Sequence, residues 1–129
     1  MAIITLTESN FRREVLEGDT PVIVDFYADW CGPCKQIAPA LEALSVRWEG
    51  MVRFAKVDIE AYPAIANGYN ISSIPAVLRF EQGSVTNWCL GAKPAHVIER
   101  ELRLTPRGVK GGPATGRGLL SRLLEWVTG

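Results

Sequence analysis

The chain has 129 residues, 47% of them hydrophobic, and its 14 basic and 14 acidic side chains give a formal net charge of zero. This length fits one domain with a short remainder, and the apolar content is typical of a globular protein. No apolar run reaches the roughly 18–20 residues that cross a bilayer. The N-terminus has no leader pattern of a basic stretch followed by an apolar stretch, so we expect a cytoplasmic protein. We also expect no nucleic-acid partner.

The pattern of apolar residues predicts five strands and four helices. The strands are expected at 3–6, 22–27, 52–59, 76–80 and 85–90. The helices are expected around 11–16, from the residues after Cys34 to Trp48, at 62–69 and at 95–102. This order predicts a layered α/β domain, in which the early strands pair in parallel and the last two form an antiparallel hairpin.

The composition changes after Leu104. Residues 105–118 contain two prolines and five glycines, which predicts a flexible linker, and residues 119–128 have an amphipathic pattern if they are helical. The tail is basic, whereas the rest of the chain is mildly acidic. We therefore expect a domain at 1–104 and a tail at 105–129, which stays disordered, docks on the domain or on a partner, or binds weakly to an anionic membrane surface.

Two cysteines stand where a predicted strand ends and a helix begins. Cys31 and Cys34 follow the apolar run at 22–27 and precede the apolar helix face. Unpaired N–H groups and the helix dipole favour an anion at this position, so the pKa of Cys31 should fall below its ordinary value. Residues three apart on a helix lie close enough for a disulfide, and Gly32 and Pro33 suit the first helical turn. In a reducing cytosol such a pair is catalytic or binds a metal.

A zinc site is the alternative for this pair. Only Cys89 and His96 could complete a set of four ligands, and their spacing is too loose for a zinc finger. We therefore expect no metal. His96 is interpreted as part of a solvated helix face, and Cys89 as a packed strand residue, with an exposed reactive thiol as the alternative.

From about Ile3 to Leu104 the chain resembles the thioredoxin family. The resemblance rests on the matching residues Trp30-Cys31-Gly32-Pro33-Cys34-Lys35, Val24-Asp25-Phe26, Pro39, Lys56-Val57-Asp58, Ile74-Pro75, Gly83 and Gly91-Ala92. It implies a three-layer α/β/α thioredoxin fold, with a central mixed sheet of about five strands in the order 1-3-2-4-5 and four flanking helices. It also implies a dithiol–disulfide oxidoreductase that reduces protein disulfides through a mixed-disulfide intermediate.

The resemblance implies a role for each matching side chain near the pair. Cys31 would be the exposed nucleophile and Cys34 the shielded thiol that resolves the mixed disulfide. Asp25 matches a buried carboxylate of the family. Burial within an apolar strand should raise its pKa, which suits a general base that takes the proton from Cys34, directly or through a water. Lys56 would modulate this acid, although Asp25 could also be only a tolerated partner of Lys56.

Other matching residues would support the pair or bind substrate: Trp30, Gly32, Pro33, Ile74, Pro75 and Gly91. Trp30 would belong to an apolar docking rim. Pro75 matches a cis-proline, beside which the backbone of Ile74 would pair with an extended substrate peptide.

The resemblance implies that no cofactor is bound. Electrons would come from an NADPH- and flavin-dependent thioredoxin reductase, and a monomeric protein would pass them to disulfide-containing protein substrates. The alternative function is a thioredoxin-like interaction subunit that docks on a partner through its C-terminal tail.

Overall fold

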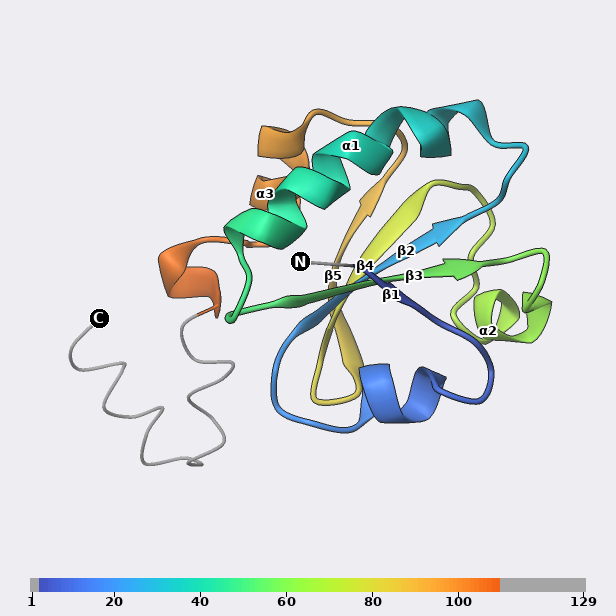
Figure 1. Cartoon of the computed structure of the whole chain (residues 1–129), viewed down its shortest axis with the longest axis horizontal. Helices are drawn as coiled ribbons and strands as arrows, with labels where there is room; N and C mark the ends of the chain where they lie inside the picture. The colour runs from blue at the N-terminus through green and yellow to red at the C-terminus, as the bar shows by residue number, and fades with distance from the viewer. Residues whose placement is uncertain (1–2, 110–129) are drawn as a thin grey trace.

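The computed structural model describes residues 3–109 (Figure 1). Its elements in chain order are β1 (Ile4–Thr5), η1 (Arg12–Leu16), β2 (Val22–Tyr27), α1 (Gly32–Arg47), β3 (Arg53–Asp58), α2 (Pro63–Gly68), β4 (Ala76–Glu81), β5 (Ser84–Leu90) and α3 (Ala95–Glu101). No helix within the described part of the chain is long and apolar enough to cross a membrane.

The five strands form one mixed sheet in the order β1-β3-β2-β4-β5. β3 pairs in parallel with both β1 and β2, whereas β4 runs antiparallel to β2 and β5. The crossover connections through helices produce the parallel pairs, and the short turn after Glu81 produces the final hairpin. The strand order expected from the family resemblance is therefore confirmed.

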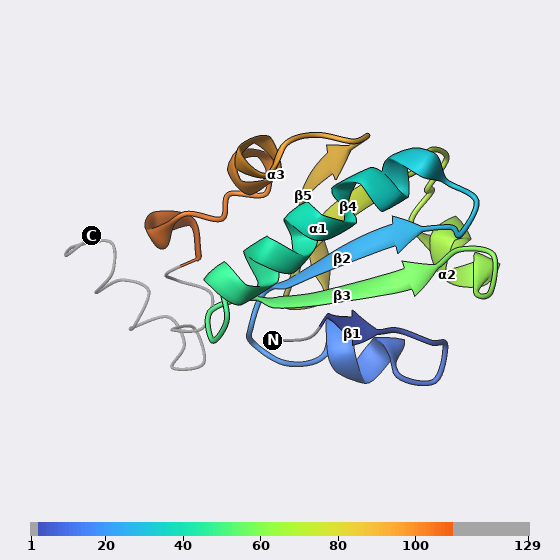
Figure 2. The same ribbon diagram turned by 45° about the horizontal axis from the view of Figure 1, so that its top comes forward.

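Helices cover both faces of this sheet, as Figures 1 and 2 show. On one face α1 and α3 enclose a core cluster that includes Ile37, Leu41 and Ile98. On the other face η1 and α2 enclose a second cluster, with Phe11 and Phe80 in edge-to-face contact. The sheet thus separates two apolar cores, and the expected three-layer α/β/α fold is confirmed.

β1 and the first helix differ most from the sequence prediction. β1 contains only Ile4 and Thr5, and the first helix is a single π-helical segment, in which the N–H of Glu17 donates to the carbonyl of Arg12 over 3.0 Å. Gly18 follows with a φ of +105°, which a glycine adopts at little cost and which turns the chain away from the helix. The helix at 11–16 is therefore correctly predicted in place, but not in type.

The chain continues in ordered structure beyond Leu104. Residues 106–109 form a helical turn, and Val109 is fully buried in the core beneath α1 and α3. A sequence rich in glycine and proline predicts a linker here, yet the side chain of Val109 packs in the core and connects the turn to it. Residues 110–129, with the predicted amphipathic segment and the remainder of the predicted linker, lie outside the described residues, so the expectation for them stays a prediction.

A buried arginine on β4 holds this C-terminal turn. Arg79 is only 2% exposed, and its Nη1 donates to the carbonyls of Leu102 and Arg103, each over 2.9 Å. Its Nη2 donates to the carbonyl of Gly108 over 2.8 Å. The guanidinium group therefore satisfies carbonyls at the end of α3 and in the turn after it, which the helix itself leaves unpaired.

Candidate redox-active site

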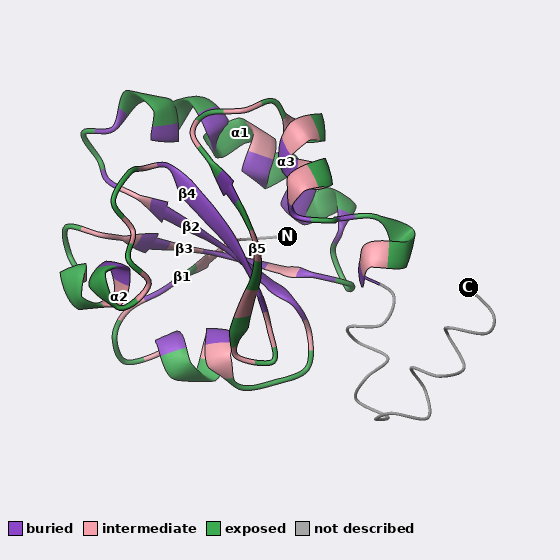
Figure 3. Cartoon of the chain, turned by 180° about the vertical axis from the view of Figure 1, so that it is seen from behind, coloured by how far each residue is buried: buried purple, intermediate pink, exposed green. Residues whose placement is uncertain are grey.

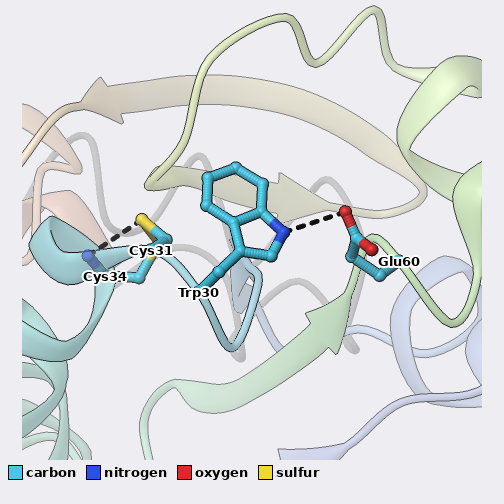
Figure 4. The surroundings of a disulfide bond; sticks show 4 residues. All are labelled: Trp30, Cys31, Cys34 and Glu60. Carbon is cyan, nitrogen blue, oxygen red and sulfur yellow. Dashed lines mark hydrogen bonds between the residues drawn. A yellow bond between two sulfur atoms is a disulfide. The ribbon is translucent and has the colours of Figure 1, made fainter.

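The two cysteines lie at the start of α1, shortly after the end of β2. They form a disulfide, with their Cα atoms 5.3 Å apart. Cys31 is the N-cap residue of α1, and its Sγ accepts the backbone N–H of Cys34 over 3.1 Å (Figure 4). Pro33 occupies the first turn, where its missing N–H leaves no gap in the helix. The predicted meeting of strand end, helix start and paired sulfurs is thus observed.

The disulfide is less exposed than expected. Cys31 is 3% exposed and Cys34 is 4% exposed, so the expectation of an exposed Cys31 is wrong for the disulfide form. The reason is packing: the two cysteines form a small apolar cluster with Ala28, against which Tyr27, Ile59 and Ile74 lie. In the disulfide form, the structural feature that distinguishes the two sulfurs is therefore the helix N-cap position of Cys31, and not unequal burial.

Asp25 lies on β2, six residues before Cys31, and is 8% exposed. Burial raises its pKa from 3.8 to about 7, and the positive charge of Lys56 opposes this rise. Within the described part of the chain, Asp25 Oδ1 has no hydrogen-bond partner. Protonation lowers the free-energy cost of burying such an unpaired carboxylate, because it removes the charge that burial disfavours.

Lys56 is the register partner of Asp25 across the parallel pair of β2 and β3. Its ammonium group also lies 5.8 Å from the centre of the Tyr27 ring, within the range of a cation–π contact. The structure thus brings Lys56 to Asp25, as the sequence predicted. The same position keeps the lysine charge at the edge of the buried site, where it limits the rise in the pKa of Asp25.

Trp30 flanks the pair on the surface and is 67% exposed. Its Nε1–H donates to Glu60 Oε2 over 2.9 Å, which fixes the ring beside the two cysteines (Figure 4). The sequence analysis did not identify Glu60, because nothing in the sequence links two residues 30 positions apart. Gly32 and Pro33, which lie between the two cysteines in the sequence, are also exposed, and a Cβ added at Gly32 would meet no atom within 4 Å.

The loop before β4 forms the other flank of the pair. The Ile74–Pro75 peptide bond is cis, as the family resemblance implies, and Ile74 packs against the two cysteines. Gly91 donates its N–H to the carbonyl of Pro75 over 2.9 Å and has a φ of +85°. Ile74, Pro75 and Gly91 are therefore assembled at the disulfide, although they come from segments far apart in the sequence.

Cys89 does not take part in this site. It is 1% exposed within the core under α3, and burial together with a hydrogen bond to Glu101 raises the pKa of its thiol to about 12. The interpretation of Cys89 as a packed strand residue is confirmed. His96 is exposed on α3, and in residues 3–109 no three side chains of the metal-binding types lie together, so the alternative zinc site is not assembled.

The mixed sheet, with a disulfide at the start of α1 and a cis-proline beside it, defines a dithiol–disulfide oxidoreductase. Comparisons with known proteins agree: the family model for thioredoxin matches residues 2–103. Thioredoxin C-2 of Corynebacterium nephridii is 48% identical over 92 residues, which cover 71% of this chain and 85% of the relative. Thioredoxin 1 of Nostoc sp. is 38% identical over 101 residues, which cover 78% of this chain and 94% of the relative.

Thioredoxin of Rickettsia felis is 42% identical over 86 residues, which cover 67% of this chain and 82% of the relative. The chain belongs to the thioredoxin family. It is a protein-disulfide reductase that acts through the Cys31–Cys34 pair, and its activity needs no bound cofactor.

Proposed function

We propose that Cys31 is the attacking thiolate and Cys34 the resolving thiol in the reduction of protein disulfides. The observation that supports this order most directly is the hydrogen bond from the Cys34 N–H to the Sγ of Cys31 at the N-terminus of α1. An N–H donor and the helix dipole both stabilise negative charge on that sulfur. The sulfur of Cys34 lies one turn into the helix and lacks the N-cap position.

The proposed reaction has two exchange steps. The thiolate of Cys31 attacks one sulfur of the substrate disulfide, which forms a mixed disulfide and releases the first substrate thiol. The thiolate of Cys34 then attacks the Sγ of Cys31, so the second substrate thiol leaves and the Cys31–Cys34 disulfide closes. Two electrons pass from the pair to the substrate, and each leaving sulfur takes up one proton.

Asp25 acts in the second step of this proposal. The thiol of Cys34 must lose its proton before it can attack, and a carboxylate whose pKa is about 7 can accept that proton near neutral pH. Its buried Oδ1 has no other partner among the described residues, which leaves this atom free to hold a proton. Lys56 keeps a fraction of Asp25 ionised, because its charge opposes the rise in pKa.

The partners belong to the same proposal. The disulfide form must be reduced again after each turnover, and we assign this step to an NADPH- and flavin-dependent thioredoxin reductase. A monomer that works in the cytoplasm, on a range of disulfide-containing proteins, fits such recycling. Trp30, Gly32, Pro33, Ile74, Pro75 and Gly91 would form the surface that meets these partners.

Insulin reduction by NADPH and a thioredoxin reductase tests this proposal. We expect the wild type to turn over insulin, and we expect Cys31→Ser to fall to the uncatalysed rate, because it cannot form the mixed disulfide. Cys34→Ser should accumulate that mixed disulfide, which mass spectrometry detects. Cys89→Ala is the matched control and should retain wild-type turnover. Equal turnover by the wild type and Cys31→Ser would contradict the proposal.

A further inference from the structure

An open groove lies next to the redox site, on the face of the sheet that η1 and α2 cover elsewhere. Its volume is about 300 Å³. Ala76 and Leu78 on β4 line it together with Trp88 and Leu90 on β5, and the loop at 69–73 closes the remaining side. Since Ala76 pairs with Leu90 and Leu78 with Trp88, these four side chains lie on one face of the β4–β5 hairpin.

The groove exists because, on this face of the sheet, none of the helices in residues 3–109 covers β5. This strand lies at the edge of the sheet, and the two helices on this side are short, with five residues in η1 and six in α2. In Figure 3, β5 is therefore coloured as exposed or intermediate over most of its length, whereas β2 and β4 are buried. Trp88 remains 60% exposed and Leu90 46% exposed. Large apolar side chains left open in a hollow are typical of a binding surface.

The groove adjoins the two segments that flank the redox site. Its loop runs from Ser73 directly into Ile74 and Pro75, and Ile74 packs against the two cysteines. On the other side of the groove, Leu90 precedes Gly91, whose N–H donates to the carbonyl of Pro75 over 2.9 Å. A substrate segment that brings its disulfide to Cys31 along Ile74 therefore passes the mouth of this groove.

The lining of the groove indicates what it can hold. None of the residues that line it is an acid, a lysine, an arginine or a histidine. The one titratable side chain is Tyr69, and burial raises the pKa of its phenol, so it stays neutral. Asn70, Ser72 and Ser73 provide polar groups at the rim that can pair with a peptide backbone. The apolar wall and floor favour an uncharged, large apolar side chain, and an exposed indole favours an aromatic one.

We propose that this groove is a substrate subsite, in which an aromatic side chain of the substrate protein, a few residues from its reacting cysteine, packs against Trp88 and Leu90. The inference rests on the proposed function, because it assigns a sequence preference to the same disulfide exchange. It predicts that substrates with an aromatic residue near the reactive disulfide are reduced faster than substrates with only polar residues there.

Synthetic peptides test the subsite. Each peptide carries one cysteine, activated as a mixed disulfide with thionitrobenzoate, in a serine- and glycine-rich sequence. One peptide has no other feature, and the others have a single tryptophan at successive positions on either side of the cysteine. We expect the reduced wild type to attack the best tryptophan peptide about tenfold faster, as kcat/KM, than the plain peptide.

Variants of the groove identify where this preference arises. Trp88→Ala should lose most of the tenfold ratio, and Trp88→Phe should keep most of it, because the ring can still stack. Val46→Ala is the control, since Val46 is another exposed apolar side chain, at 59%, on α1 and outside the groove. This variant should keep the full ratio.

Each result decides between the two proposals. Equal rates with all peptides, or a full ratio in Trp88→Ala, would overturn the subsite and leave the reductase function intact. No attack on any peptide would overturn both. Equal rates together with a dimer that forms at high protein concentration, and that Trp88→Ala abolishes, would assign the groove to a second copy of the chain and would overturn the peptide subsite.

Discussion

Asp25 is the residue at which burial and the proposed function oppose each other most clearly. A carboxylate inside a strand of apolar residues destabilises the folded state whenever it is charged, and yet a proton acceptor for Cys34 must be able to lose its proton. Because the pKa of Asp25 is about 7, its charged and neutral forms are both populated at neutral pH. The sequence already indicated the rise in pKa, whereas its size depends on how closely the surrounding side chains pack.

The stability of the oxidised protein should therefore depend on Asp25 in a pH-dependent way. The folded-state pKa lies above the ordinary value of 3.8, so the folded state binds more protons between these two values, and stability falls as pH rises from about 4 to 7. Asp25→Asn should remove this loss. We expect it to raise the free energy of unfolding by roughly 2–4 kcal/mol at pH 8 and to give little gain at pH 4. Denaturant unfolding at pH 4, 6 and 8 measures the difference.

A gain in stability that is the same at all three pH values would show that Asp25 does not titrate in this range. Asp25→Asn also tests the proposal that Asp25 is the base that accepts the proton of Cys34. If Asp25 accepts the proton of Cys34, Asp25→Asn should slow the resolution of the mixed disulfide near pH 7 more than its formation. An unchanged pH profile for resolution would contradict that role.

At the scale of elements, the structure depends on an arginine that joins β4 to the end of α3. Arg79 is buried among carbonyls, and burial lowers the pKa of its guanidinium group, although the group stays charged. Three carbonyl oxygens and the carboxylate of Glu81 receive its hydrogen bonds. Removal of the donor would leave the carbonyl oxygens without a partner in an environment that water reaches poorly.

Arg79→Leu should therefore destabilise the protein by roughly 2–4 kcal/mol, although leucine suits a buried strand better than arginine does. Hydrogen exchange should at the same time accelerate at 102–109. Arg47→Leu is the matched control, since Arg47 forms an ion pair with Glu99 at the surface and is 68% exposed. Arg47→Leu should lower the free energy of unfolding by less than about 1 kcal/mol. Similar destabilisation by both substitutions would indicate that Arg79 does not hold the turn.

At the scale of the whole molecule, the sheet divides the apolar interior into two parts. Ile37 belongs to the cluster beneath α1 and α3, and Val57 to the cluster beneath η1 and α2. Interior packing transmits strain between side chains in contact, and these two clusters have no residue in common. The two cores should therefore contribute to stability independently.

Substitutions on opposite sides of the sheet test this independence. We expect Ile37→Val to lower the free energy of unfolding by about 0.5–1.5 kcal/mol and Val57→Ala to lower it by roughly 1–3 kcal/mol. The double variant should lower it by the sum of the two values, within about 0.5 kcal/mol. Denaturant unfolding of the three variants supplies the values. An interaction energy well above this margin would mean that strain passes through the sheet and that the two clusters act as one core.

The sequence predicted the architecture because the relevant signals are local. An apolar run at 22–27 is typical of a central strand, and the pattern from Ile37 to Trp48 is typical of one helix face, so the position of the cysteines between them could be predicted. The family resemblance supplied the order of the strands and the cis bond before Pro75.

The parts that could not be predicted depend on contacts over long distances. Nothing near Arg79 in the sequence indicates that its partners are carbonyls 23 to 29 residues away. The exposure of Trp88 also had no local signal, because an alternating strand does not show which of its faces a short helix leaves open. The equal burial of the two cysteines depends on Ile59 and Ile74, which come from other segments.

The turn held by Arg79 also determines at which end of the sheet the described part of the chain ends. β4 begins at the cis-proline beside the disulfide and runs toward Arg79, so the turn lies at the opposite end of the sheet from Cys31 (Figure 1). A carrier joined directly at Val109 would therefore lie at the end of the sheet opposite Cys31. This geometry makes the domain suitable for an immobilised reductant, in which the attachment does not obstruct the substrate.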